Sequence, residues 1–317
     1  MKQHGWMGIG GILVAGLLVW ACSSEETESN TPTTTAPGGT GGQSTGGTGG
    51  TGGTGGATGG TTAQGGGGGG GLPIVEESEP NDGGTATEYD DLGLNEVMTG
   101  AIGTAGDADV FRLPTTGGNA YEAVLEPQSG SPLQPHLTVM DDGRDSDPPA
   151  DDYVKIVRGS SGAVRIQWLA MGQGGYFVTV RDARNVDGGS VGEDTFRYGL
   201  TVTEITVASV TVGALPTTSA HSGALSFPGA IDLFTFTATA WQDALIDLQA
   251  SGDLDGRLFV VAEATGDWIA RNDDRAYGDP DPLIDAPLTE GGNLLLVVES
   301  IAETPTGLGY SLTASVQ

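Results

Sequence analysis

Cysteine and basic residues are scarce in this sequence. Cys22 is the only cysteine among 317 residues, so no disulfide can form within the chain. Lysine and arginine number 12 against 41 aspartates and glutamates, which gives a formal net charge of −29. Such a surface repels nucleic acid and anionic lipid headgroups, and it attracts divalent cations and basic partners. For any single acidic residue, solvation of the surface is the alternative role.

Residues that could carry catalysis are also few. Beyond the first 21 residues only His136 and His221 are histidines, and both lie beside turn residues. Residues 188–192 (GGSVG) match the pattern of a nucleophilic serine at Ser190, but that pattern needs a strand-to-helix turn and here falls in a Gly/Asp loop. No insertion that could form a cleft accompanies the carboxylates. We therefore expect no enzyme, with an unrecognised hydrolase as an alternative.

Long apolar runs are absent as well. The run over residues 9–20 is too short for a comfortable membrane span, and Lys2 precedes it. It ends at Val19-Trp20-Ala21-Cys22, which resembles the lipobox of bacterial lipoproteins, with Trp20 as a departure from the usual small or β-branched residue. Residues 1–21 are accordingly expected to be a lipoprotein signal peptide. The alternative is an ordinary secretory signal followed by an incidental cysteine.

Lipidation is therefore expected at Cys22. A cysteine that carries diacylglycerol and palmitate would hold the protein stably in a membrane, because several acyl chains insert. Ser23 follows, where an aspartate would have resembled an inner-membrane retention signal, so we expect the outer membrane. Exposure at the cell surface is left open.

A Gly/Thr/Ser tract fills the chain from Cys22 to residue 71. It has TGG repeats, a run of Gly and no apolar periodicity, so it is expected to be a disordered linker. A phosphate-binding loop is not expected, because neither a preceding strand nor a following Lys-Ser/Thr is present. The linker would hold the folded part at a distance on the order of 40 Å from the membrane.

Beyond residue 72 the apolar pattern has a period of two, which is typical of half-buried antiparallel strands. Gly, Pro and Asp clusters separate these short segments, which favours a β-sandwich or jelly roll. No segment has a sustained helical period. The expected strands are 97–102, 109–113, 120–125, 137–140, 153–157, 163–168, 176–180, 198–203, 234–240 and 310–316.

The second half of the chain repeats the first in order. Residues 107–113 align with 230–236, residues 174–180 align with 291–297, and a Tyr-initiated strand closes each half. The offset of the repeat is that of a whole domain. We therefore expect two tandem sandwich domains, 72–205 and 206–317, with a boundary near 204–206.

Motifs in the first domain resemble those of the bacterial pre-peptidase C-terminal domain. These are ESEPND at 77–82, Gly100, DADVF at 107–111, GGYFVTV at 174–180 and YGLTV at 198–202. The match of the second domain is weaker. The resemblance implies a jelly-roll sandwich related to collagen-binding modules of collagenases.

The resemblance also implies a calcium site in the first domain. The ligands carried over onto this sequence are Glu77, Glu79, Asn81, Asp82, Asp107 and Asp109. Five carboxylates and one amide suit Ca²⁺, which takes six to eight oxygen ligands. The alternative is a solvated entry segment in which Pro80 sets a turn.

The second domain departs from this pattern. Its entry segment has no acidic residue from 207 to 226 and only Asp232 remains of the D-x-D motif, so no equivalent site is expected there. The acidic stretches 141–147 and 273–281 are expected to be hairpin loops. We expect the aromatic residues Tyr153, Trp168, Trp241 and Trp268 to be packing residues rather than contact residues.

Together these features predict a non-enzymatic lipoprotein at the outer membrane. Its tandem sandwiches would bind an extracellular protein or polysaccharide, with the first sandwich stabilised by calcium. The alternative is a structural spacer, or an accessory or chaperone-like partner of a secreted hydrolase. Nucleic acid is not an expected partner.

Overall fold

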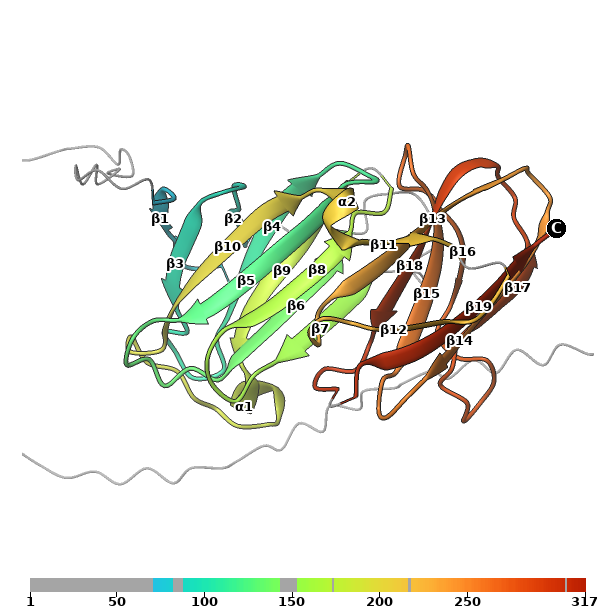
Figure 1. The fold of residues 1–317 in the computed structure, drawn as a ribbon. Helices are drawn as coiled ribbons and strands as arrows, with labels where there is room; N and C mark the ends of the chain where they lie inside the picture. Colours follow the sequence, from blue (N-terminus) through green and yellow to red (C-terminus); the bar gives the residue numbers. More distant parts are fainter. Residues whose placement is uncertain (1–70, 82–87, 143–152, 173, 216–217, 306) are drawn as a thin grey trace, which may run out of the picture. The chain divides into compact units, whose positions relative to one another are not determined.

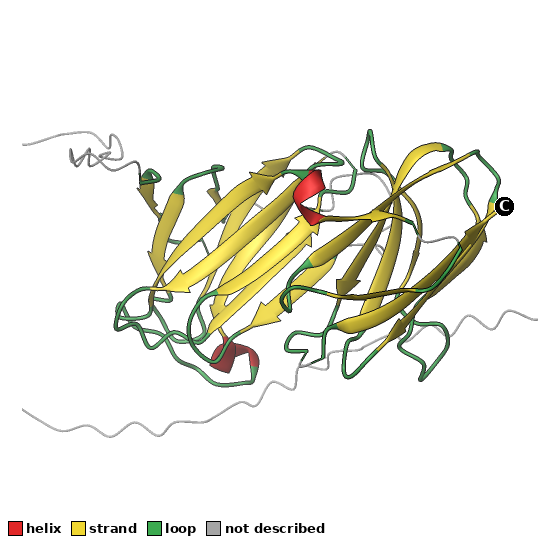
Figure 2. Ribbon diagram, viewed as in Figure 1, coloured by secondary structure: helices red, strands yellow, loops and turns green. Residues whose placement is uncertain are grey.

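The protein is almost entirely β-structure in a computed structural model that describes residues 71–81, 88–142, 153–172, 174–215, 218–305 and 307–317. Strands joined by loops make up these residues, with only two four-residue helices, α1 (Ala183–Val186) and α2 (Val207–Val210) (Figure 2). Among the described residues, no helix has the length and apolar character that crossing a membrane requires. The expectation of an all-β chain of sandwich domains is confirmed.

The first sandwich consists of sheets A and B (Figure 1). Sheet A has the order β1-β3-β10-β5-β8, and sheet B has the order β2-β4-β9-β6-β7. Their bounds are β1 Ile74–Glu76, β2 Asp90–Asp91, β3 Val97–Ala101, β4 Ala108–Thr115, β5 Ala120–Pro127, β6 Pro135–Asp141, β7 Val154–Arg158, β8 Val164–Leu169, β9 Gly174–Asp182 and β10 Arg197–Ile205.

The second sandwich consists of sheets C and D. Sheet C has the order β11-β13-β18-β15-β16, and sheet D has the order β12-β19-β14-β17. Their bounds are β11 Thr211–Ala214, β12 His221–Ala224, β13 Ile231–Ala238, β14 Asp243–Ala250, β15 Gly256–Ala262, β16 Trp268–Asn272, β17 Leu283–Pro287, β18 Gly292–Ser300 and β19 Gly309–Val316.

The two sandwiches share one strand order. Sheet C repeats sheet B strand for strand, and sheet D repeats sheet A without its edge strand β1. The register corrects the sequence alignment by one residue. Asp109 pairs with Val180 and Asp232 with Val298, so Gly174 corresponds to Gly292 rather than to the residue before it. The domain boundary near 204–206 stays a prediction, since residues 61–317 cluster as a single compact unit.

Each strand expected from the period of two is present. The alternation places one face of each strand in a core, as in β5, where Ala123 and Leu125 are buried and their neighbours are not. The sequence did not predict β1, β2, β11, β12, β14, β15, β16 or β17. In β15 the reason is physical, because consecutive apolar residues replace the alternation.

The central strands of sheet C, β13, β18 and β15, have buried residues on both faces. Phe234, Leu258, Leu294, Leu296 and Val298 face the core of the second sandwich. The alternate residues of the same strands belong to the apolar core of the first sandwich: Ile231, Leu233, Phe259, Val261, Leu295 and Val297. A strand that is covered on both faces needs apolar residues at consecutive positions, and the sequence of β18 has such a continuous apolar run.

Buried polar groups join the two sandwiches at this interface. Lys155 of β7 reaches Glu299 of β18 at 3.1 Å and also donates to the carbonyl of Ala230. In the opposite direction, Arg257 of β15 bonds Glu299 and donates to the carbonyl of Val154 at 3.0 Å. Each of these buried charges is therefore hydrogen-bonded, which offsets the cost of burying it.

Candidate functional site: a carboxylate cluster at the entry to the first sandwich

Strand β1 places Glu77 against the end of β3. The strand runs parallel to β3, and the backbone N–H of Glu77 donates to the carbonyl of Thr99. The Glu77 carboxylate then accepts the N–H of Ala101 at 2.6 Å. Gly100 makes this approach possible, because a Cβ at that position would lie 2.2 Å from Glu77 Oε2.

Asn81 fastens the same segment to β4. The N–H of Val110 donates to the carbonyl of Asn81 at 2.9 Å, and the N–H of Asn81 donates to the Glu79 carboxylate at 3.3 Å. The Asn81 side chain is fully buried, yet neither its oxygen nor its nitrogen completes a hydrogen bond. The amide contacts the Glu77 carboxylate and lowers its pKa, but the contact lacks the geometry of a full hydrogen bond, so the amide oxygen is available to a ligand.

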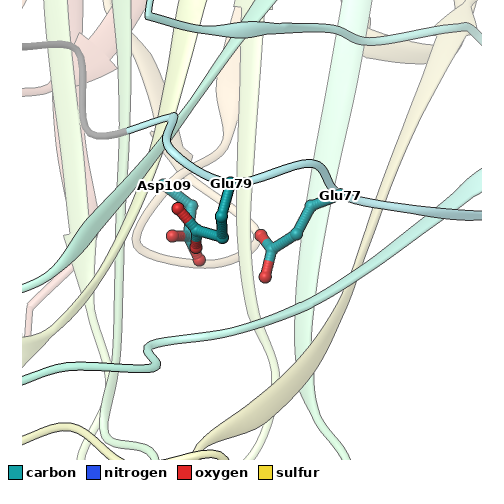
Figure 3. A group of neighbouring side chains, drawn as sticks. All are labelled: Glu77, Glu79 and Asp109. Atoms are coloured by element: carbon teal, nitrogen blue, oxygen red, sulfur yellow. The ribbon is translucent and has the colours of Figure 1, made fainter. Parts of the chain in front are cut away.

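Three carboxylates meet at this point. Oxygen atoms of Glu77, Glu79 and Asp109 all lie within 4.8 Å of one another. Figure 3 shows the carboxylates of Glu79 and Asp109 side by side, with that of Glu77 next to them. Asp109 is fully buried, and its Oδ1 has no hydrogen-bond partner.

Tyr198 of β10 bridges two of the three carboxylates. Its hydroxyl oxygen lies 2.7 Å from Glu77 Oε2 and 2.5 Å from Asp109 Oδ2. A hydroxyl carries one proton and can donate to only one of them, so the other contact needs a proton on the carboxyl group. Without a cation, at least one carboxyl of the cluster is therefore held protonated.

The electrostatics agree with this geometry. Burial, followed by the charge of Glu77, raises the pKa of Asp109 to about 9. Burial also raises the pKa of Glu77, against the lowering effect of the hydrogen bond from Tyr198. A divalent cation in the cluster would reverse both shifts, because it favours the ionised form of each carboxyl.

The donor set fits a hard cation. Every available ligand atom is an oxygen of a carboxylate or of the Asn81 amide, and oxygen is the ligand that Ca²⁺ prefers. A cavity of ≈ 470 Å³ lies beside Glu77 and gives solvent access to it. Its lining consists of Glu76, Glu77, Thr99, Gly100, Ala101, Gln128 and Arg197.

The structure brings together some of the ligands that the sequence suggested and not others. Glu77, Glu79 and Asp109 converge, and Asn81 is buried where the segment joins β4. The carboxylate of Asp107 instead accepts the backbone N–H groups of residues 103, 104 and 108, as a turn cap does. Asp82 and Cys22 lie outside the described residues.

Sequence reasoning missed Tyr198 as a member of this site. The residue was noticed only as the start of a closing strand, although the same Tyr recurs at position 310. The second sandwich repeats the contact in reduced form, because Tyr310 donates to Asp232 at 2.6 Å. His221 is adjacent, with its ring against those of Phe234 and Tyr310.

The candidate catalytic residues do not form a constellation. Ser190 is exposed in the loop between α1 and β10. His136 is buried in sheet B and neither ring nitrogen has a hydrogen-bond partner, while His221 packs on aromatic rings in the second sandwich. Burial lowers the pKa of His136 and so disfavours its charged form.

Of the four aromatic residues expected to pack, two are buried and two are exposed. Tyr153 and Trp168 are buried in the core. Trp241 is 70% exposed because it lies in the turn before β14 rather than on an inward strand position. Trp268 is 38% exposed on edge strand β16, where the Arg271 guanidinium covers its ring at 5.4 Å.

The two acidic stretches differ in their place in the fold. Strands β6 and β7 pair antiparallel, so 141–147 belongs to a hairpin connection, of which 143–147 lies outside the described residues. Residues 273–281 were also expected to form a hairpin loop, which is wrong. They connect β16 of sheet C with β17 of sheet D, because the chain changes sheets at the edge of the sandwich.

Similarity to known proteins is confined to structures. No protein-family profile and no curated protein matches the sequence. A periplasmic inhibitor of g-type lysozyme from Aeromonas hydrophila is similar at 23% identity over 34% of this chain and 96% of its own, with a TM-score of 0.26. The pre-peptidase C-terminal domain of collagenase from Bacillus anthracis is similar at 15% identity over 36% of this chain and 94% of its own, with a TM-score of 0.25.

A third similar structure covers more of the chain. The tandem CBM51 modules of a family 98 glycoside hydrolase from Streptococcus pneumoniae match at 9% identity over 69% of this chain and 84% of their own, with a TM-score of 0.22. The strand order itself defines an all-β protein of sandwich modules, and its described residues include a cluster of three carboxylates of which only Asp109 is buried.

Proposed function

We propose that this chain is a non-enzymatic binding protein whose first sandwich is stabilised by calcium. The observation that carries the calcium proposal is the convergence of Glu77, Glu79 and Asp109, with the buried Asn81 amide in contact with Glu77. Three neighbouring carboxylates repel one another, and a Ca²⁺ ion would neutralise them while the Asn81 oxygen supplies a further ligand.

Calcium would stabilise the start of the folded chain. Glu77 follows the edge strand of sheet A, and Asp109 lies on β4 of sheet B. An ion held by both would tie the entry segment to the two sheets at once. The point where the Gly/Thr tract meets the sandwich would then be rigid, which suits a module held away from a membrane.

Calcium binding provides the direct test. We expect the full chain to take up a single equivalent of Ca²⁺, with a dissociation constant at or below the ~1 mM typical of extracellular modules. Asp109→Asn should abolish uptake, because it removes a central ligand. Asp232→Asn is the matched control, since Asp232 occupies the corresponding position and bonds the corresponding Tyr.

Isothermal titration calorimetry with both variants distinguishes the outcomes. Uptake lost in Asp109→Asn and kept in Asp232→Asn supports the site. Absence of calcium uptake by the wild-type chain would show that the cluster is held by protons alone.

An extracellular protein or polysaccharide is the proposed partner class. Seven of the ten described lysine and arginine residues form ion pairs, so anionic ligands such as nucleic acid find few free positive charges. Ion pairs are formed by Arg112, Lys155, Arg158, Arg165, Arg184, Arg257 and Arg275. A groove of ≈ 550 Å³ that contains Arg158 and Arg165 is no exception, because Asp187 and Glu122 bind those side chains.

Anchoring through Cys22 belongs to the same proposal and rests on the lipobox-like sequence. We expect radioactive palmitate to label the wild-type chain expressed in a Gram-negative host and not the Cys22→Ser variant. The labelled protein should fractionate with the outer membrane. A chain cleaved by signal peptidase but unlabelled and released into the periplasm would contradict lipidation and indicate an ordinary secretory signal.

A structural spacer or an accessory partner of a secreted hydrolase is the second candidate. The observation that favours it is the interface between the sandwiches, where the central strands of sheet C have buried residues on both faces and Glu299 is fully buried. This makes a stiff two-sandwich unit. Retention of one secreted enzyme by the immobilised chain, with no retention of matrix protein or polysaccharide, would favour this role.

A further inference from the structure

The outer face of sheet D carries exposed apolar side chains. Residues of β14 alternate strictly, so that Ala244, Ile246 and Leu248 are buried while Leu245 is 47% exposed. Leu245 pairs across the sheet with Asp285 of β17, which is also exposed. No described segment packs over this pair, so the sheet presents a leucine to solvent beside a carboxylate.

Trp241 lies in the turn two residues before β14. Its N–H donates to the carbonyl of Leu288, while the N–H of Leu288 donates to the carbonyl of Gln242. Trp241 and Gln242 therefore lie opposite the single residue Leu288. This is the arrangement of a β-bulge whose first residue has a left-handed backbone conformation and is usually glycine. Trp241 occupies that position at φ 70° with its side chain 70% exposed. Packing does not explain a tryptophan there.

The connection between β16 and β17 carries a second exposed aromatic residue. Arg275, between β16 and β17, bonds the outward carboxylate of Asp247 on β14. This bond holds the loop over the sheet edge, because β17 separates it from β14. Tyr277, two residues further, is fully exposed.

The charge of this face is negative. Asp243 and Asp285 are exposed, and neither enters an ion pair with a described residue. The guanidinium of Arg275 is already neutralised by Asp247 and Asp279. Lysine and arginine side chains have an aliphatic stem and a cationic head, so they complement exposed Trp and Leu side chains that lie between unpaired carboxylates. An indole ring also attracts a cation over its face.

We propose that the sheet D face, defined as Trp241, Asp243, Leu245 and Asp285 with Tyr277 at its rim, binds a protein segment that presents lysine or arginine side chains. This inference rests on the proposed binding function and assigns its location and the chemistry of its partner. Charge complementarity selects the partner: the carboxylates take the cationic heads, while Trp241 and Leu245 contact the stems. The carboxylate cluster of the first sandwich takes no part.

Binding of a labelled peptide tests the proposal. The probe is a fluorescein-labelled octapeptide of alternating Lys and Val, titrated with the full chain at low ionic strength and followed by fluorescence polarisation. We expect saturable binding that weakens with salt. Trp241→Ala should weaken it about fivefold, by loss of the cation–π contact. Trp241→Gly should weaken it equally while keeping the fold, because glycine suits φ 70°.

Charge variants separate a site from general attraction. Asp243→Asn/Asp285→Asn should weaken binding by more than tenfold. Glu126→Gln/Asp194→Asn removes the same charge from exposed positions of the first sandwich and should change it less than twofold. Equal losses in the two double variants, or no loss in either Trp241 variant, would overturn the proposal.

Two further arms separate this inference from the proposed function. Binding should be the same in calcium and in EDTA, because the face lies in the second sandwich. Cello- and chito-oligosaccharides form the other arm. If they bind at Trp241 while the peptide does not, the protein remains a binding module and the basic-segment proposal is wrong.

Discussion

Replacing Glu299 with glutamine is expected to be among the most destabilising single changes in this protein. The Glu299 carboxylate accepts Lys155 Nζ at 3.1 Å, the Tyr153 hydroxyl at 2.9 Å and Arg257 Nε at 2.8 Å. Glutamine keeps the shape and leaves two buried cations without their anion. Breaking a buried ion pair in this way costs about 3–5 kcal/mol, or a fall in melting temperature of roughly 10 °C or more.

Two variants make this prediction specific. Lys155→Met leaves a balanced pair of Arg257 and Glu299, so it should cost less than Glu299→Gln. Glu303→Gln removes an exposed bridge to Arg158 at 3.0 Å between the same sandwiches and should cost at most about 1 kcal/mol. Calorimetric unfolding measures all three. A Glu299→Gln cost no larger than that of Glu303→Gln would show that the buried network is not holding the interface.

Removing calcium is expected to lower stability, and more so at high pH. Burial raises the pKa of Asp109 from 3.8 to about 9, so the folded state holds this proton more tightly than the unfolded state does. The resulting stabilisation of the folded state is complete below pH 3.8. That contribution is lost as the pH rises toward 9, because the unfolded state releases the proton earlier. In EDTA the free energy of unfolding should therefore fall between pH 5 and pH 9 through this group.

Calcium should offset this loss. At a concentration of about 100 times the dissociation constant, the ion stabilises the chain by about 2.7 kcal/mol, or roughly 5–10 °C in melting temperature. The shift should be larger at pH 8 than at pH 5, because protons compete with the ion for the carboxylates. Melting curves of wild type and Asp109→Asn in calcium and in EDTA check this. A wild-type shift that is zero, or equal at both pH values, contradicts the expected linkage.

Much of the fold was predictable from local patterns. In β10 and β13, apolar residues alternate with Thr, and alternation of this kind reports one buried face. The repeated DxDVF-like and Gly-Gly segments indicated a second copy of the same strand order. β15 and β18 were harder to interpret, because their continuous apolar runs satisfy neither a period of two nor a helical period.

The candidate site was predictable only in part. The acids of the entry segment and Asp109 were marked by their spacing within short motifs. Asp107 was indistinguishable from Asp109 in sequence. Its carboxylate nevertheless caps backbone N–H groups and does not belong to the cluster of Glu77, Glu79 and Asp109. Tyr198 lies 89 residues from Asp109 along the chain, so no local pattern could connect them.

The sequence by itself determined the all-β class, the repeated strand order and the concentration of acids where the folded part begins, because period, turn residues and charge are local properties. Tertiary structure alone decided which acids converge, that the central strands of sheet C are covered on both faces, and that Trp241 is exposed while Trp168 is not. These depend on pairing between strands distant in the chain. A residue's environment is set by the partners that the fold brings to it.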